Sequence, residues 1–279
     1  MKYVDLHVHS TASDGTFTPK EVVKLAAKAG LSAFALTDHD TVKGVDEAIE
    51  AAKKLNLEVI PGVEISTRYK EKEIHIVGLF LDHHNSQLLV GLGNEIDIRN
   101  KRNQMLIEKF NEYGFPVTME KMHEMFPDSV ITRAHFASYM AKKGYVKSTL
   151  DAFNRYLGEG MPLYVPRDKK SPEEAIKLIT SAGGVAILAH PLLYHLTMGE
   201  LKDLCIMLKD LGLVGIESMY STYKGFDELS VKNLAKEVGL LESGGSDFHG
   251  ANKPHIKIGS GMGTLRISSE YMEKLRKAR

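Results

Sequence analysis

The segment YVDLHVH at residues 3–9 is followed by TPKE at residues 18–21, and these two segments decide the start of the fold. Alternating apolar and polar side chains predict a strand over 3–9, and its period of two places His7 and His9 on one face. TPKE supplies the N-cap, the N1 proline and the capping-box glutamate of a helix that ends near Gly30. The chain therefore begins with a strand followed by a helix.

Short apolar segments and amphipathic helices alternate through most of the remaining chain. Further strands are predicted at residues 33–37, 58–66, 74–81, 185–189, 214–217 and 240–244. With the first strand this makes about seven, and the alternation favours an α/β fold. A length of 279 residues fits either two ordinary domains or one large α/β barrel.

The strand pattern stops between Asn85 and Pro166, where helical spacing appears around residues 95–113, 133–142 and 149–157. We therefore expect a helical insertion at 86–165, which would act as a substrate cap. Residues 1–85 and 166–279 would form the barrel. Residues 86–170 carry 13 Lys and Arg against 10 Asp and Glu, a surplus too small to identify a ligand.

Composition excludes several classes of protein. The chain is 43% hydrophobic and 26% charged, as soluble globular proteins are, and its 36 basic residues balance 36 acidic ones. The zero net charge removes the simplest argument for non-specific nucleic-acid or membrane binding. No apolar segment approaches the ~20 residues that span a bilayer, and the N-terminus lacks signal-peptide features, so we expect a cytoplasmic protein. The single cysteine, Cys205, excludes a disulfide framework and has the spacing of a buried helix position.

Histidines and carboxylates gather where the predicted strands end. His7 and His9 end the first strand, and the others are His39, Glu64, His190, Asp247 and His249. In closed α/β barrels such residues converge at one mouth. His75 begins its strand instead, but a hairpin between 58–66 and 74–81 would bring it next to Glu64.

The donor types indicate the metal chemistry. Imidazoles and carboxylates without a thiolate fit Mn²⁺, Zn²⁺ or Fe²⁺, and the set is larger than one ion needs. Two ions about 3.5–4 Å apart can hold a hydroxide between them and neutralise charge on a displaced phosphate oxygen. The pattern thus predicts a hydrolytic site with several metal ions.

Several segments together resemble one family. In order they are DLHVHSTASDGTFTP (5–19), ALTDHDTVKG (35–44), IPGVEIST (60–67), IHIVG (74–78), AHP (189–191) and SGGSDFHG (243–250). They resemble the motifs of the PHP family, named for polymerase and histidinol phosphatase, from Met1 to about Gly261. TRAHFA (132–137) and YVPRDKKSPEEAI (164–176) are most similar to stand-alone members that act on nucleotides, including 3′,5′-nucleotide bisphosphate phosphatases and 5′–3′ exoribonucleases.

The resemblance implies a distorted (β/α)7 barrel with two or three divalent ions, Mn²⁺ first and Zn²⁺ or Fe²⁺ as alternatives. The implied ligands are His7, His9, Glu64 and Asp247 for the first ion, Glu64, His75 and His190 for the second, and Asp14, His39 and His249 for the third. Some relatives carry histidine at the position of Asp14. The implied catalytic residues are Asp247, His190 and Arg133, and Arg133 and His135 are candidate substrate contacts.

The resemblance thus implies a metal-dependent phosphoesterase in which a metal-bridging hydroxide attacks a small phosphoester, such as a nucleoside 3′,5′-bisphosphate or a short oligonucleotide. Two alternatives stay open, amide hydrolysis by the same ions and a non-catalytic metal-binding module. We expect no membrane partner, and no obligate protein partner is evident. Glu217 would either support a metal ligand or make a structural hydrogen bond. Arg99 and Arg102 share one helical face, which could reach the site from the insertion, although a solvated face is the favoured prediction. The histidines outside the motifs, His83 and His84 among them, are expected to be solvated or hydrogen-bonded.

Overall fold

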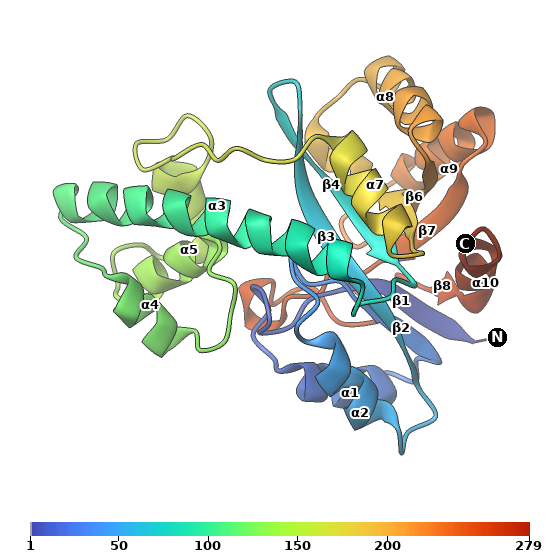
Figure 1. Ribbon diagram of the computed structural model, residues 1–279, viewed down its shortest axis with the longest axis horizontal. Helices are drawn as coiled ribbons and strands as arrows, with labels where there is room; N and C mark the ends of the chain where they lie inside the picture. Colours follow the sequence, from blue (N-terminus) through green and yellow to red (C-terminus); the bar gives the residue numbers. More distant parts are fainter. Residues whose placement is uncertain (1) are drawn as a thin grey trace.

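The computed structural model describes residues 2–279, and a sheet curled into a nearly closed barrel forms its centre (Figure 1). Met1, the first residue of the predicted barrel segment 1–85, lies outside the described residues. The strands are β1 (Tyr3–Val8), β2 (Ala33–Leu36), β3 (Glu58–Tyr69), β4 (Lys72–Leu79), β5 (Val185–Leu188), β6 (Leu213–Tyr220), β7 (Leu241–Gly245) and β8 (Ile267–Ser268). Their order is β7-β6-β5-β4-β3-β2-β1-β8.

The seven predicted strands are all present, and β8 is the one addition within residues 2–279. It pairs antiparallel with β1 over two residues, which is too short to leave a periodic pattern. Strands β1, β2 and β3 are parallel neighbours, as are β5, β6 and β7. Between them β4 runs antiparallel to both β3 and β5, so the predicted hairpin is confirmed.

The barrel closes between β1 and the end of β7 by two backbone hydrogen bonds. The amide of Asp247 donates to the carbonyl of His7 at 2.8 Å, and that of His9 donates to Phe248 at 3.0 Å. Gly245 makes this approach possible, because a Cβ at that position would overlap the Cβ of His7. The metal-ligand candidates of β1 are thereby held next to those that follow β7.

Six helices cover the outside of the sheet in the part of the chain that the structure describes. They are α1 (Pro19–Lys28), α2 (Val45–Ala52), α7 (Pro172–Ser181), α8 (Met198–Asp210), α9 (Asp227–Val238) and α10 (Ser269–Lys277), with 3-10 turns at Pro191–Tyr194 and Gly250–Asn252. The predicted capping boxes of α1 and α7 are both formed. Cys205 is fully buried in α8, as predicted.

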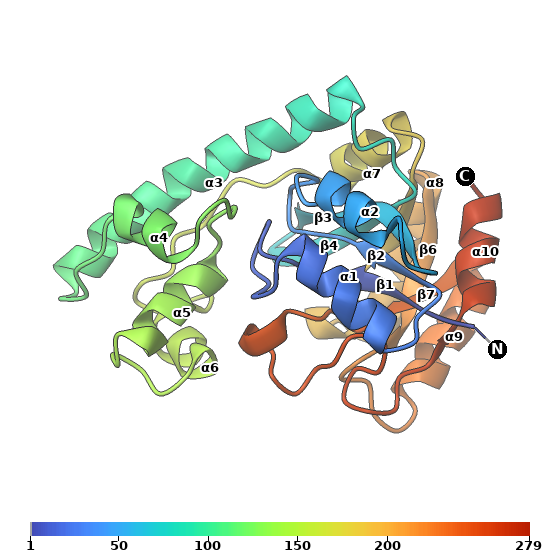
Figure 2. The same ribbon diagram turned by 90° about the horizontal axis from the view of Figure 1, so that it is seen from below.

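The remaining helices are α3 (Ser86–Glu112), α4 (Met119–Met125), α5 (Arg133–Lys142) and α6 (Thr149–Ala152), which continues as a π-helix over Phe153–Leu157. Figure 2 shows them beside the barrel, with α3 running from the barrel outward. They share an apolar cluster of their own that includes Phe110 and Phe136. The first turns of α3 instead pack Leu88 and Leu92 into the barrel cluster that includes Ile179 of α7. In residues 2–279 no helix has the length and apolar character to cross a bilayer.

Candidate metal centre

His7 and His9 reach the barrel mouth from β1, and both side chains are fully buried. Their Nε2 atoms lie 3.1 Å apart and each is 3.3 Å from Oε2 of Glu64. The predicted shared face of the two imidazoles is therefore confirmed. Two ring nitrogens and one carboxylate oxygen converge on a single point.

Glu64 faces two groups of histidines with its two oxygens. Oε2 points to His7, His9 and also His39, whose Nδ1 is 3.0 Å away. Oε1 lies 2.7 Å from Nδ1 of His75 and 2.9 Å from Nε2 of His190. Burial opposes ionisation, but the neighbouring histidines hold the pKa of this carboxyl well below its usual range. The carboxylate thus faces ring nitrogens with both of its oxygens.

The β3–β4 hairpin explains how His75 joins this group from the start of its strand. Ser66 pairs with His75 across the hairpin, so Glu64 and His75 are diagonal neighbours at the same edge. The antiparallel direction of β4 brings the beginning of that strand to the mouth where its neighbours end. The expected proximity of Glu64 and His75 is confirmed.

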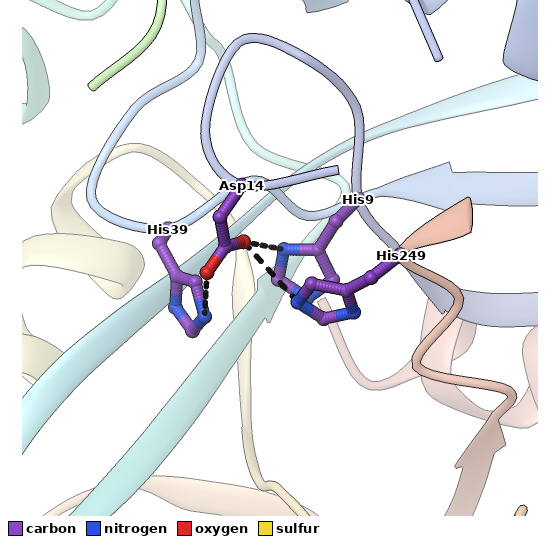
Figure 3. A group of neighbouring side chains, drawn as sticks. All are labelled: His9, Asp14, His39 and His249. Atoms are coloured by element: carbon purple, nitrogen blue, oxygen red, sulfur yellow. Dashed lines mark ion pairs between the residues drawn. The ribbon is translucent and has the colours of Figure 1, made fainter. Parts of the chain in front are cut away.

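Asp14 forms a second cluster with His9, His39 and His249, and Figure 3 shows the four side chains pointing toward one another. Oδ1 of Asp14 lies 3.2 Å from Nε2 of His249 and 3.8 Å from Nδ1 of His9, and Oδ2 lies 3.8 Å from Nε2 of His39. His9 therefore faces both clusters, whereas the resemblance assigns it to the first ion alone.

The loop that carries Asp14 is fixed by a neighbouring acid. Asp38, two residues after the end of β2, accepts hydrogen bonds from the amides and hydroxyls of Ser10 and Ser13 at 2.6–3.1 Å. Buried carboxylates need such partners, since an unpaired buried charge is costly. Asp38 therefore orients the Asp14 loop toward His39, the next residue of its own segment.

Asp247 adds a carboxylate from the end of β7. Its Oδ1 lies 3.4 Å from Nε2 of His9 and 3.2 Å from Nδ1 of His249. Its Oδ2 accepts a hydrogen bond from Tyr220 and pairs with Lys253, each at 2.5 Å. No sequence motif marks Tyr220 or Lys253, so neither could be predicted from the sequence.

Backbone strain accompanies these positions. Asp40, His190 and Asp247 have positive φ angles of 55°, 26° and 54°. Non-glycine residues adopt such angles rarely, and where they do the surrounding structure must hold them. Each of the three follows a strand at the barrel mouth, and they are three of the seven non-glycine residues with positive φ in residues 2–279.

Glu217 of β6 makes both interactions that the sequence left open. Its Oε1 accepts from Nδ1 of His7 at 2.9 Å, and its Oε2 accepts from the backbone amide of His190 at 2.6 Å. The first bond places the proton of a neutral His7 on Nδ1, so the lone pair of Nε2 points toward Glu64. Metal-ligating histidines are typically oriented by such a carboxylate.

The charges around the histidines fit divalent ions. Although burial lowers it, hydrogen bonds to Asp247 and Glu64 raise the pKa of His9 to about 9, and Glu64 and Glu73 raise that of His75 to about 9. The carboxylates thus favour a positive charge at the point where the nitrogens converge. A divalent cation supplies that charge, and imidazole with carboxylate suits first-row transition metals. The clusters are able to bind metal ions.

A cavity of about 140 Å³ opens beside the clusters, and Asp14, His39 and His75 form part of its wall. The other wall is basic. It comprises Arg99 and Arg102 of α3, Arg133 of α5, and Arg167 and Lys169 of the segment that leads to α7.

The prediction that Arg99 and Arg102 occupy a solvated face is wrong. They are only 6% and 5% exposed, because α3 presents this face to the barrel mouth and the Arg99 guanidinium pairs with buried Asp40. Arg167 approaches the same carboxylate at 3.4 Å. Helical spacing alone placed the two arginines on one face but could not show what that face packs against.

The cavity holds more positive than negative charge. Glu73 pairs with Arg133 at 3.0 Å and with Lys169. Within residues 2–279 no carboxylate pairs with Arg102, whose pKa is lowered by burial and by Arg99 and Arg133. Burial also lowers the pKa of Lys169 to about 8. An anion that enters the cavity would therefore compensate these cations for their lost hydration and reduce the repulsion between them.

Sequence reasoning missed Arg167, Lys169 and Glu73. The basic residues at 166–170 belong to a segment that the resemblance covers. Their positive charge is the sequence feature that could have identified Arg167 and Lys169 as candidates. Glu73 adjoins the IHIVG segment, where nothing distinguishes it from a solvated hairpin residue.

His135 lies behind the cavity wall, not among the lining residues. It is 1% exposed, and its Nδ1 accepts from the amide of Thr132 at 2.9 Å, which completes the capping box of α5. Burial lowers its pKa to about 4, so the imidazole is neutral. This arrangement favours a structural role, and the predicted substrate contact of His135 stays a prediction. Arg133, by contrast, reaches the cavity as expected.

The sequence of this chain matches a known protein family. Residues 5–179 match the model of the PHP domain, and this stretch contains the ligand candidates from His7 to His75. The chain belongs to the PHP family. The predicted family and the predicted barrel fold are both confirmed, with β8 as an added strand.

Two relatives of this PHP protein act on nucleotides. It is 39% identical over 248 residues to a 5′–3′ exoribonuclease of Haemophilus influenzae, covering 89% of this chain and 90% of the relative. It is 33% identical over 260 residues to a 3′,5′-nucleoside bisphosphate phosphatase of Chromobacterium violaceum, covering 93% and 91%. Both relatives hydrolyse phosphoesters, as expected for this chain from the resemblance.

Two solved structures share the PHP fold along almost the whole chain. One is an amidohydrolase from Chromobacterium violaceum with bound sulfate and no metal, with a TM-score of 0.89, 31% identity, and coverage of 99% of this chain and 96% of that one. The other, from Bifidobacterium adolescentis, is assigned as a metal-dependent phosphoesterase and has a TM-score of 0.88, 28% identity and the same coverage.

Proposed function

We propose that this PHP protein is a metal-dependent phosphoesterase that hydrolyses one phosphate of a small nucleotide carrying a second phosphate, such as a nucleoside 3′,5′-bisphosphate. One observation carries the proposal. Asp14, His39 and His75, which belong to the clusters able to bind metal ions, line the same cavity as the five cations. Two phosphates of one small molecule can be bound by these two walls.

In this proposal the ligands fall into three sets. The first comprises His7, His9, Glu64 and Asp247, the second Glu64, His75 and His190, and the third Asp14, His39 and His249. Two or three bound ions, Mn²⁺ first and Zn²⁺ or Fe²⁺ as alternatives, would make a water nucleophilic at neutral pH and neutralise the charge on the displaced oxygen. Asp247 and His190 would be catalytic residues at this centre, as the resemblance implies.

The protein's own side chains prepare this site. Glu217 keeps the proton of His7 on Nδ1 and so leaves Nε2 free to bind a cation. Tyr220 and Lys253 hold one oxygen of Asp247 and leave the other facing His9. His7 and Asp247 are therefore oriented before substrate arrives, which lowers the cost of reorganisation during the reaction.

The basic wall would bind the second phosphate. Arg133 and Lys169 form charge-assisted hydrogen bonds with Glu73 in the structure and would form them with phosphate oxygens instead. Tyr164, whose ring lies 5.3 Å from the Arg133 guanidinium, and Phe153 also line the cavity. They offer an aromatic surface against which a nucleobase can stack.

The two alternatives are less well supported. The same ions could support amide hydrolysis, but an amide substrate has no need of five cations. A non-catalytic module would not need intact ligands, whereas all nine predicted ligand positions carry metal-binding residues. A cavity of about 140 Å³ favours a mononucleotide, or the end of a short oligonucleotide, over a duplex. The cytoplasmic location and the lack of an obligate protein partner stay predictions.

The deciding experiment compares a nucleoside 3′,5′-bisphosphate with the matching monophosphate in the presence of added Mn²⁺. We expect a higher kcat/KM for the bisphosphate, and Arg133→Ala should erode the difference by about ten- to a hundredfold, since a hydrogen bond to a charged group is worth roughly 1.5–3 kcal/mol. Arg155→Ala is the matched control, because this arginine is 52% exposed and pairs with Asp151 away from the cavity.

Three outcomes separate the parts of the proposal. Equal hydrolysis of the two substrates would refute bisphosphate selectivity while leaving phosphoesterase activity standing. An equal effect of Arg133→Ala on both substrates would refute the role of Arg133. Failure to hydrolyse any of a panel of phosphoesters with any of the three metals would refute the function itself.

A further inference from the structure

Two neighbouring histidines outside the barrel mouth face one carboxylate. His83 and His84 lie in the connection between β4 and α3, and Asp46 lies in the first turn of α2. The Nε2 atoms of His83 and His84 are 2.9 and 3.3 Å from the same oxygen of Asp46, Oδ1. None of the three residues lines the cavity at the mouth.

The three side chains share the geometry of an open coordination site. One donor atom from each lies within 4.8 Å of the others, and the two imidazole rings are side by side with centroids 4.2 Å apart. The side chain of His83 is only 13% exposed, whereas those of Asp46 and His84 are 67% and 66% exposed. The largely buried imidazole of His83 thus forms the inner side of the site, and the outer side is open to water.

The donor set selects the class of ligand. Two imidazoles and one carboxylate suit Zn²⁺, Ni²⁺ or Cu²⁺ better than Mg²⁺ or Ca²⁺, which prefer oxygen donors. We propose that Asp46, His83 and His84 form a separate binding site for one such transition-metal ion on the outer surface of the barrel. Water molecules complete the coordination.

The position of the site gives the ion a structural consequence. Asp46 belongs to α2, and the two histidines immediately precede α3, which begins at Ser86. A bound ion therefore ties the start of α3 to the barrel, in place of one hydrogen bond from His83 and one ion-pair contact from His84 to exposed Asp46. It stabilises the fold without contacting the reacting groups.

The first test counts bound Zn²⁺ by equilibrium dialysis followed by elemental analysis at micromolar free Zn²⁺. The double variant His83→Ala/His84→Ala should hold one ion fewer per chain than the unmodified protein. His255→Ala, which removes a single exposed histidine that belongs to none of the clusters, is the matched control and should lose none. Identical counts in all three proteins would overturn the proposal.

The second test uses Asp46→Asn, which preserves the shape of the side chain and keeps both histidines. It should also lose one ion, and the Zn²⁺-dependent rise in melting temperature should be smaller than in the unmodified protein. If Asp46→Asn retains the ion and the full rise, the three residues do not form a metal site. Activity with added Mn²⁺ should be unchanged in every variant, so the result does not depend on the function proposed above.

Discussion

The Nη2 atom of Arg133 donates to Oε2 of Glu73 at 3.0 Å inside the cavity, so the arginine offered to substrate already holds an anion. The same carboxylate pairs with Lys169, and its other oxygen lies 3.2 Å from Nε2 of His75. Glu73 therefore connects the basic wall with the candidate metal centre. In the proposed function, an incoming phosphate would displace Glu73 from Arg133 and Lys169.

Glu73→Gln removes this competing charge. We expect the KM for the bisphosphate to fall by about fivefold, since a partly exposed ion pair is worth about 1 kcal/mol. We also expect kcat to fall, because His75 loses a carboxylate partner. Steady-state kinetics measure both constants. Glu71→Gln is the matched control, since its side chain is 91% exposed on the same hairpin turn. A rise in KM would mean that Glu73 positions the cations and does not compete with substrate.

Two buried glutamates should differ in their effect on metal content. Glu64→Gln removes a charge that faces two groups of nitrogens, so we expect loss of up to two ions per chain and a fall in kcat of roughly a thousandfold or more. Glu217→Gln changes only the partner of His7 and His190, and should lower metal affinity or activity about 10- to 100-fold. Metal analysis and kinetics after chelation and reloading check both. Equal losses in the two variants would contradict a bridging role for Glu64.

Asp14 supplies the one carboxylate in its cluster with His9, His39 and His249. Asp14→His would make the donor set entirely nitrogen, so we expect the ratio of bound Zn²⁺ to Mn²⁺ to rise after equilibration with equal amounts of both. Asp14→Asn, which keeps the size of the side chain, should instead weaken binding of both ions. An unchanged ratio in Asp14→His would show that Asp14 is not a ligand.

His135 should make stability depend on pH. Its pKa is lowered from 6.5 to about 4 by burial, so the unfolded chain binds a proton at a pH where the folded protein does not. The stabilisation present above pH 6.5 is lost as pH falls toward 4, at about 1.4 kcal/mol per pH unit. His135→Gln retains a capping-box acceptor that does not titrate, and denaturant unfolding of this variant should lose less stability over that range. Parallel curves for the two proteins would contradict this role.

The strands and their capped helices could be predicted from the sequence because local patterns determine them. The period of two in β1 and the capping box at Thr18 both express local geometry, and both are present in the structure. The hairpin that carries His75 was also predictable, because Glu64 and His75 flank a short polar turn.

The basic cavity could not be predicted in the same way. Arg99 and Arg167 meet at Asp40 although 68 residues separate the two arginines, and no local pattern encodes that contact. Tertiary packing determines which face of α3 lies against the barrel mouth, and helical spacing carries no information about that packing. Tyr220 and Lys253 escaped prediction for the same reason, since their function depends on one oxygen of Asp247.

Helix α3 has a mechanical consequence for substrate selection. Its 27 residues make a rod about 40 Å long, with Leu88 and Leu92 anchored on the barrel and Arg99 about 20 Å from its start. Arg99 lies about 14 Å beyond the midpoint of this anchor, so a tilt of about 5° there would move it by ~1.2 Å, more than a third of the length of a hydrogen bond. Exchanging Leu88 or Leu92 for a larger or smaller side chain would therefore change the position of Arg99 in the cavity. These two positions are the natural starting points for changing substrate preference without altering any residue that lines the cavity.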